Sequence, residues 1–239
     1  MSVQKPSLLK VRNSKLTWPL QRFFRRVGLS IVSNTSELEG QLYLRVNDLG
    51  LRWCIDVGAH HGEFIERLQR INVDLRILAI EPSHKAARVL IHKNFKNVNV
   101  VEMGLGLIES PTKLYESGSV FASVKKRKDR LTQTGSETVQ IRRLDKLINE
   151  FPHIELNKTL LKLDTQGSEL EILKGSEKLL ELIPLVLVEV PLNSLYSESF
   201  SIEDILSFMK ERSFIVSSIN TPRFNNGKPY DCDILFSKE

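Results

Sequence analysis

Short apolar runs alternate with amphipathic stretches along most of this chain. Five of the runs have the length of a buried strand: 53–57, 75–80, 98–103, 160–163 and 185–190. Between them, apolar residues recur at helical spacing, as at Phe64, Leu68 and Ile71. Strands that alternate with helices favour a parallel sheet with helices packed on both of its faces.

The last part of the chain has a different pattern. Residues 214–219 and 230–236 predict two further strands, and the short connection between them contains the turn signal Asn225-Asn226-Gly227. A short connection suits an antiparallel pair. The predicted fold is therefore α/β, a doubly wound and mostly parallel seven-stranded sheet with an antiparallel last strand.

Polar residues mark the starts of several predicted helices. Ser83 is expected to cap a helix that ends near Asn94. The inward residues of this helix should be Ala86, Ala87, Leu90 and Ile91. The capping-box spacing occurs twice more, in Ser168/Glu171 and in Ser201/Asp204.

Residues 107–138 show no clear period and are rich in polar side chains. We expect a long loop here, of the kind that often serves as a lid or binding loop. The basic run 125–130 would attract an anionic partner, but no nucleic-acid-binding module surrounds it. We interpret this run as solvated and expect no nucleic-acid partner. Residues 139–141 predict a strand fragment, and Asp145 is placed to cap the short helix that follows.

Positive charge is concentrated at the N-terminus. The first 36 residues hold seven Lys and Arg side chains and no acid, whereas all 239 residues together carry a net charge of only +5. We therefore divide the chain into a basic N-terminal arm, 1–36, and one domain, 37–239. No export signal is apparent, and Cys54 and Cys232 are too few for a disulfide framework. These features predict a cytoplasmic protein.

Apolar residues lie between the arginines of the arm, at Trp18, Leu20, Phe23, Phe24, Val27 and Leu29. One interpretation is a basic amphipathic helix that lies on the inner face of an anionic membrane or on a partner. The other is a helix that packs on the domain with its charges in solvent. No apolar run in the sequence reaches the roughly 18 residues needed to span a bilayer, so any membrane contact would be peripheral.

The first predicted strand ends in a glycine turn, Asp56-Val-Gly58-Ala-His-His-Gly62. Glycines at Gly58 and Gly62 would let the backbone approach a ligand closely. A nicotinamide dinucleotide would require a further glycine between them, and the carboxylate of Asp56 would repel its pyrophosphate. Asp56 instead suits a ligand with an ammonium and a sulfonium group, such as S-adenosylmethionine.

A second carboxylate, Glu81, follows the next strand and precedes Pro82. The carboxyl ends of strands in open α/β sheets bind nucleoside-type ligands. Glu81 is expected to accept hydrogen bonds from a ribose diol, while the backbone at Gly104 faces the adenine. The alternative is an ordinary strand-to-helix turn with a surface glutamate.

Two more carboxylates should reach the same edge of the sheet. Asp164 ends the run 160–163, and Glu189 lies near the end of 185–190. Asp164 is our first choice for accepting a proton from a substrate hydroxyl, or for binding Mg²⁺ with Glu189 as a second ligand. Alternatively, Asp164 orients the methionine end of the cofactor, and Glu189 is a paired structural acid.

Two histidines lie inside the glycine turn. An imidazole at this position could contact the carboxylate of the cofactor or act as a base. We retain His60 as a candidate for both roles and interpret His61 as a solvent-exposed residue.

Five segments of the chain together resemble the FkbM-type methyltransferases: 55–64, 80–82, 143–145, 161–175 and 231–236. The most specific of them is 161–175, and the resemblance runs from about Cys54 to the C-terminus without covering the arm. It implies a class I, Rossmann-like methyltransferase that depends on S-adenosylmethionine and usually acts on a hydroxyl, often of a sugar. The family usually has Asn where this chain has His60. Its serine cluster is only loosely echoed, by Ser117, Ser119 and Ser123.

We therefore expect an S-adenosylmethionine-dependent O-methyltransferase whose acceptor is a sugar, a glycan or a related small metabolite. The expected cofactor-binding residues are Asp56, Gly58, Ala59, His60, Gly62, Glu81, Pro82 and Gly104. The expected catalytic residues are Asp164 and His60, with Asp164 and Glu189 as candidate Mg²⁺ ligands. Two other classes stay open: an NAD-dependent oxidoreductase, and a noncatalytic module of the same fold that docks through its basic arm.

Overall fold

The computed structural model describes residues 37–117, 121–125, 133–192, 200–225 and 227–238. The basic arm, Ser119 and all but the first residue of the run 125–130 lie outside these ranges. The interpretations of the arm and the domain boundary at residue 37 therefore stay predictions. None of the helices within the described ranges has the length and apolar content that crossing a bilayer requires.

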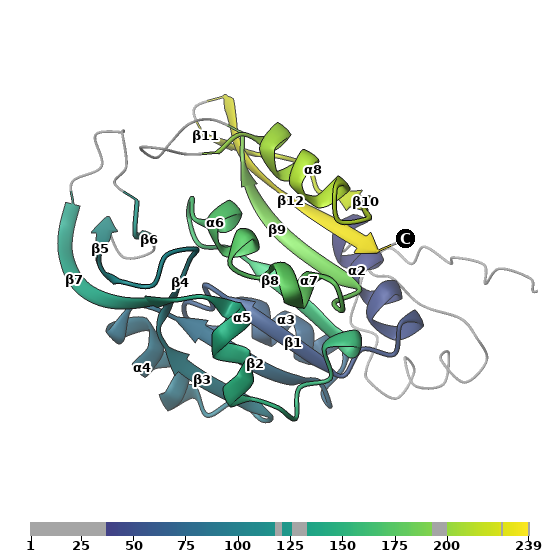
Figure 1. The fold of residues 1–239 in the computed structure, drawn as a ribbon, viewed down its shortest axis with the longest axis horizontal. Coiled ribbons are helices and arrows are strands. Elements are labelled where there is room, and N and C mark those ends of the chain that lie inside the picture. Colours follow the sequence, from purple (N-terminus) through teal and green to yellow (C-terminus); the bar gives the residue numbers. More distant parts are fainter. Residues whose placement is uncertain (1–36, 118–120, 126–132, 193–199, 226, 239) are drawn as a thin grey trace, which may run out of the picture.

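A mostly parallel sheet runs through the centre of the molecule (Figure 1). Its spatial order is β10 (Phe214–Ile219), β12 (Lys228–Lys238), β9 (Leu185–Pro191), β8 (Thr159–Leu163), β1 (Trp53–Val57), β2 (Arg76–Glu81) and β3 (Val98–Glu102). Strand β12 is antiparallel to both of its neighbours, and the short β11 (Arg223–Asn225) pairs with the beginning of β12. The predicted fold class, including the reversed last strand, is confirmed.

The central strands are buried on both faces, which explains their continuous apolar runs. One face packs on α2 (Glu37–Asp48), α3 (Glu63–Ile71) and α4 (His84–Lys93). The other packs on α5 (Leu144–Leu147), α6 (Glu169–Lys174), α7 (Glu177–Leu180) and α8 (Ile202–Lys210). Two 3₁₀ turns, Ile148–Glu150 and Leu156–Lys158, complete the connection from α5 to β8.

A second, small sheet occupies much of the segment that was expected to be a loop, so the prediction of a long loop over 107–138 is wrong. Its order is β4 (Gly104–Leu105), β7 (Gln133–Arg142), β5 (Pro111–Ser117) and β6 (Phe121–Ser123). Leu114, Val139 and Ile141 are buried together, with Val124 packed against them. These residues are distant in sequence, so no local period indicates the sheet.

The helix start at Ser83 is confirmed, since its side chain accepts a hydrogen bond from the backbone N of Ala86. Ala86, Ala87 and Leu90 are buried as expected. The inward placement of Ile91 is wrong, because 56% of its surface is exposed.

The capping box of Ser201 and Asp204 is confirmed at the start of α8. The box expected at Ser168 is wrong, because the Ser168 hydroxyl makes no hydrogen bond to the described residues. Asp145 does not cap α5 either. It lies within the first turn of α5, and its carboxylate accepts a hydrogen bond from the backbone N of Leu179, which ties α5 to α7.

The order of the strands determines where a ligand can bind. From β1 the chain continues to β2 and β3 on one side, whereas β8 and β9 are added on the other side. The crevice beyond the carboxyl end of β1 therefore lies between two connections that diverge, which is the usual ligand site in open α/β sheets.

Candidate functional site

A cavity opens at this point, beyond the carboxyl ends of β1, β2 and β8. The small sheet contributes Leu114 and Ser123 to its wall, so the segment that looked like a loop forms part of the site. Of the predicted site residues, the cavity wall includes Gly58, Ala59, His60, Glu81, Pro82, Gly104 and Asp164. It does not include Asp56, Gly62 or Glu189.

Gly58 packs the turn after β1 directly against the end of β8. A Cβ atom on this residue would lie 1.8 Å from the backbone O of Asp164, and its φ of +77° is one that side chains disfavour. Gly62, with φ +87°, packs on Phe95 and Leu90 away from the cavity. Both glycines are therefore required by the geometry of the turn, but only Gly58 faces the cavity.

Glu81 is buried at the carboxyl end of β2. Its Oε2 accepts a hydrogen bond from the backbone N of His60 at 2.8 Å, and its Oε1 accepts one from the backbone N of Ser83 at 2.9 Å. Burial raises the pKa of Glu81 to about 7, although these two N–H groups favour the charged form. Each oxygen keeps a lone pair that can accept a hydrogen bond from a ligand in the cavity.

Asp56 is fully buried, and it pairs with a lysine instead of lining the cavity. It lies in register with Lys162 on β8, and the Nζ atom of Lys162 is 3.0 Å from Oδ1 of Asp56. Burial raises the pKa of Asp56, and the charge of Lys162 opposes this shift. Lys162 also donates a hydrogen bond to the backbone O of Gly58, at 3.2 Å.

Lys162 lies between Asp56 and Asp164, since its Nζ is 3.5 Å from Oδ2 of Asp164. Burial disfavours a charge on Lys162, but the two aspartates outweigh this effect and raise its pKa. Burial likewise disfavours a charge on Asp164, yet Lys162 overcomes it and the pKa of Asp164 is lowered. Lys162 therefore links the buried Asp56 to Asp164 on the cavity wall.

Asp164 and Glu189 lie close together, as predicted, but an amide nitrogen is between them. Nε2 of Gln166 donates to Oδ1 of Asp164 at 3.1 Å and to Oε1 of Glu189 at 2.9 Å. The other oxygen of Glu189 pairs with Arg223 at 2.5 Å. The interpretation of these two carboxylates as Mg²⁺ ligands is therefore not supported, because nitrogen donors occupy the positions of a cation.

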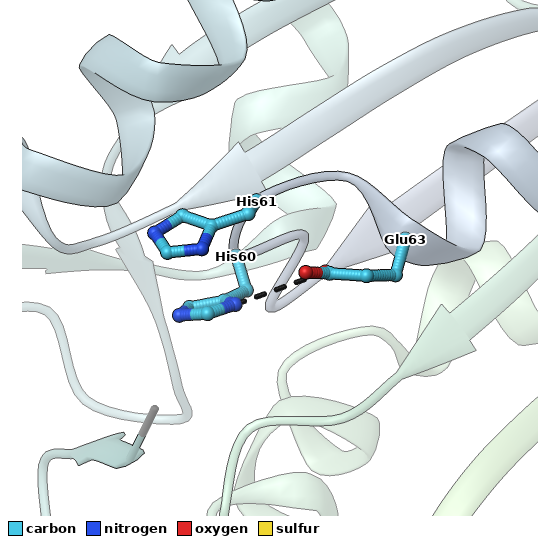
Figure 2. Close-up of side chains that lie close together, drawn as sticks. All are labelled: His60, His61 and Glu63. Atoms are coloured by element: carbon cyan, nitrogen blue, oxygen red, sulfur yellow. Dashed lines mark ion pairs between the residues drawn. The ribbon is translucent and has the colours of Figure 1, made fainter. Parts of the chain in front are cut away.

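His60, His61 and Glu63 form a group at the edge of the cavity (Figure 2). Figure 2 shows the two imidazoles stacked, with the Glu63 carboxylate directed at His60, and the ring centroids are 3.8 Å apart. Each side chain offers a possible metal ligand within 4.8 Å of the others. The group also lies at the N-terminus of α3, which favours anions.

Burial lowers the pKa of His60, so its imidazole is neutral near pH 7. His61 does not line the cavity. Arg67, one turn further along α3, does line it, and its guanidinium lies 5.4 Å from the centre of the Phe64 ring. This end of the cavity therefore suits a carboxylate group of a ligand.

Several residues of the cavity wall were not predicted, among them Lys162, Gln166, Arg67 and Leu114. A signal for Lys162 was present, because a lysine within an apolar strand must be paired, the same reasoning that was applied to Glu189. Gln166 comes shortly after the candidate Asp164, and Arg67 comes shortly after the glycine turn. Leu114 belongs to the small sheet and has no such signal.

The profile described as Methyltransferase FkbM domain matches residues 56–216. The chain belongs to the FkbM methyltransferase family. The matched range begins at Asp56 and contains every predicted site residue, from the glycine turn to Glu189. The resemblance stated from sequence motifs is thereby confirmed, and no curated protein matches the chain.

Solved structures show the same fold. A putative O-methyltransferase from Klebsiella pneumoniae has a TM-score of 0.50 at 10% identity, over 92% of this chain and 88% of that one. The methyltransferase FkbM from Methylobacillus flagellatus has a TM-score of 0.49 at 17% identity, over 78% of this chain. This FkbM-family chain spans only 43% of the length of that protein. At 10% identity the comparison with the Klebsiella protein establishes the fold alone.

Proposed function

We propose that this chain binds S-adenosylmethionine and transfers its methyl group to a hydroxyl of a sugar, a glycan or a related metabolite. Membership of a methyltransferase family and the class I fold support the cofactor and the reaction. The hydroxyl acceptor is the expectation drawn from the sequence resemblance, and the sugar is its most frequent form.

Glu81 is the single observation that carries the cofactor assignment. A buried carboxylate whose two oxygens are already fixed by backbone N–H groups is preorganised to accept two further hydrogen bonds in defined directions. The vicinal diol of a ribose offers two such donors. A residue without this task would be expected at the surface, since a buried carboxylate is unfavourable.

The remaining wall of the cavity is complementary to the other parts of the cofactor. Pro82, Met103 and Ile172 offer an apolar surface for a purine, near Gly104. The negative charge of Asp164 suits an ammonium and a sulfonium, and the start of α3 suits the carboxylate. A pyrophosphate would meet the negative group instead, which disfavours a nicotinamide dinucleotide.

The bound cofactor supplies an electrophilic methyl group on a sulfonium. With the cofactor bound, the protein would have to hold the acceptor oxygen against this methyl group, and the acceptor would lose its proton on transfer. Asp164 lines the cavity and is held in its charged form, so it can accept a hydrogen bond from the acceptor hydroxyl. The hydroxyl proton then leaves through Asp164 to solvent as the ether forms.

Calorimetric titration with S-adenosylhomocysteine, with NAD⁺ as the comparison ligand, tests the cofactor assignment. We expect micromolar binding of S-adenosylhomocysteine and none of NAD⁺. Glu81→Ala should weaken binding by about 1–3 kcal/mol. Glu102→Ala is the matched control, because Glu102 is the register partner of Glu81 on β3 and is exposed.

Preferential binding of NAD⁺ would reject the assignment in favour of an oxidoreductase. Binding of neither ligand, together with partner binding that disappears on deletion of residues 1–36, would favour the noncatalytic module. Once cofactor binding is shown, mass spectrometry of candidate sugars and glycans after incubation tests the acceptor. Methylation at nitrogen or carbon instead of oxygen would contradict the proposed hydroxyl acceptor.

A further inference from the structure

Asp164 and Glu189 share one hydrogen-bond donor, the side-chain amide of Gln166. Its Nε2 lies 3.1 Å from an oxygen of Asp164 and 2.9 Å from an oxygen of Glu189. Two carboxylates this close repel one another unless a group between them supplies positive charge or N–H donors. In many enzymes that group is a divalent cation bound by both carboxylates. Here it is an amide.

The outer oxygens of the pair are also satisfied by nitrogen donors. Lys162 lies 3.5 Å from Asp164, and Arg223 lies 2.5 Å from Glu189. The pair therefore has a side-chain cation on each side, and these cations also pair with other carboxylates, Lys162 with Asp56 and Arg223 with Asp231 and Asp233. A metal would have to displace the amide and would meet the two side-chain cations, which would repel it.

The backbone holds Gln166 in this position against its conformational preference. Its φ is +56°, a value unusual for a residue with a side chain. The backbone O of Gln166 accepts a hydrogen bond from Ser123 on β6 at 2.7 Å, and the next residue, Gly167, donates its N–H to Glu169 at 3.0 Å. Unfavourable backbone conformations that the surroundings enforce are concentrated at functional sites.

We propose that Gln166 is a positioning residue that takes the place of a bridging cation: it holds Asp164 and Glu189 as a hydrogen-bonded pair and directs Asp164 into the cavity. Methyl transfer by this chain is then independent of divalent metal at this pair. The inference rests on the proposed function for its effect on catalysis, whereas its effect on metal binding can be measured without any methyl acceptor.

The first test converts the donor into a third carboxylate. Gln166→Glu should create a site for a hard divalent cation, because three carboxylates then face one another. Titration with Mn²⁺, followed by electron paramagnetic resonance of the free ion, should show one bound ion in Gln166→Glu and none in the wild type. Gln69→Glu is the matched control, since Gln69 is a half-buried glutamine on α3 whose amide donates to the backbone O of Lys96.

The second test removes the amide while keeping the backbone. Gln166→Gly is chosen because glycine adopts a φ of +56° without strain, so the fold should be preserved even if Gln166→Glu does not fold. We expect kcat to fall by about 10- to 100-fold at a similar KM for the cofactor, since a small misplacement of a catalytic group has effects of this size. Chelation with EDTA should leave the wild-type rate unchanged.

Three results would overturn the proposal. One is stoichiometric Mn²⁺ binding by the wild type that is lost in Glu189→Gln. Another is a Gln166→Glu protein that is folded but binds no Mn²⁺. The third is full turnover in Gln166→Gly. If no acceptor is ever methylated, the proposed function fails, but the Mn²⁺ measurements still decide what lies between the two carboxylates.

Discussion

Glu81 and Asp164 lie at equivalent places, each at the carboxyl end of a parallel strand and each on the cavity wall. Their surroundings differ in kind. Two backbone N–H groups bind Glu81, and its pKa is nevertheless raised to about 7 by burial. Asp164 lies beside the ammonium group of Lys162 and the amide of Gln166, and its pKa is lowered.

The contrast shows that the groups around a carboxylate, backbone N–H donors or a side-chain cation, decide which property of the carboxylate is fixed. Backbone N–H groups fix the direction of a carboxylate but compensate its burial only in part, so Glu81 is a well-oriented hydrogen-bond acceptor whose charge is sensitive to pH. A neighbouring cation keeps Asp164 charged at all pH values near neutrality. On the β2 side of the cavity, the surroundings therefore mainly fix the direction of the carboxylate of Glu81. On the β8 side, they mainly keep the carboxylate of Asp164 charged.

Gly58 packs the turn after β1 against the end of β8, between the two carboxylates. Its substitution should therefore have the largest effect on the stability of the protein. A Cβ atom in Gly58→Ala would collide with the backbone O of Asp164, and the residue has φ +77°. We expect a loss of more than about 4 kcal/mol in the free energy of unfolding, or no folded protein. Gly227→Ala is the control, because Gly227 has φ +76° but nothing within 4 Å of a Cβ atom. It should lose only about 1–2 kcal/mol in urea denaturation.

Removing Lys162 tests whether charge dominates on the β8 side. Lys162→Met leaves the fully buried Asp56 without its partner, so we expect a loss of about 3–5 kcal/mol in the free energy of unfolding. The double variant Asp56→Leu/Lys162→Met should recover most of this loss, because the fully buried carboxylate is removed together with its partner. Additive losses in the double variant would contradict the role of charge.

The division of tasks predicts opposite kinetic effects at the two carboxylates. Glu81→Gln should weaken the binding of S-adenosylhomocysteine by about 1–3 kcal/mol, because an amide nitrogen replaces one of the acceptor oxygens. Asp164→Asn should retain cofactor binding and lower kcat. Calorimetry and steady-state kinetics on both variants separate the two effects. Full activity of Asp164→Asn would place the proton acceptor elsewhere.

The smallest expected effect is a dependence of cofactor binding on pH. Because the pKa of Glu81 is about 7, the affinity for S-adenosylhomocysteine should be about tenfold lower at pH 6 than at pH 8, or about 1.4 kcal/mol. Glu81→Gln should show no such change. A wild-type affinity that is constant over this range would contradict the assigned titration.

The stability of the unliganded protein should vary with pH in the opposite sense. The folded-state pKa of Glu81, about 7, lies above its ordinary value of 4.5, so the folded state binds more protons between these values. The contribution of this group to stability is fully present below pH 4.5 and is lost as the pH rises through 7, by about 3 kcal/mol. Urea denaturation of the wild type and of Glu81→Gln at pH 5 and pH 8 measures how much of the pH dependence of stability comes from Glu81.

The prediction from sequence was most accurate where a signal is local. The apolar run of β1, the glycine turn and the carboxylates Glu81 and Asp164 are all recognisable within a few residues. The small sheet was missed because β5 and β7 pair residues up to 29 positions apart, such as Pro111 with Gln140, and only the fragment 139–141 of β7 shows a local strand pattern. The capping box at Ser168 was wrong, since the carboxylate of Glu171 pairs with Lys125, which is distant in sequence.

The sequence by itself determined the type and order of the main elements, the family and the placement of carboxylates at strand ends, because periodicity, glycine spacing and strand length are local properties. Only the tertiary structure decided the partners of those carboxylates. The register between β1 and β8 places Lys162 against Asp56, and the turn after β8 places Gln166 between Asp164 and Glu189. Charge and hydrogen bonding depend on distance in space, which the order of residues alone does not specify.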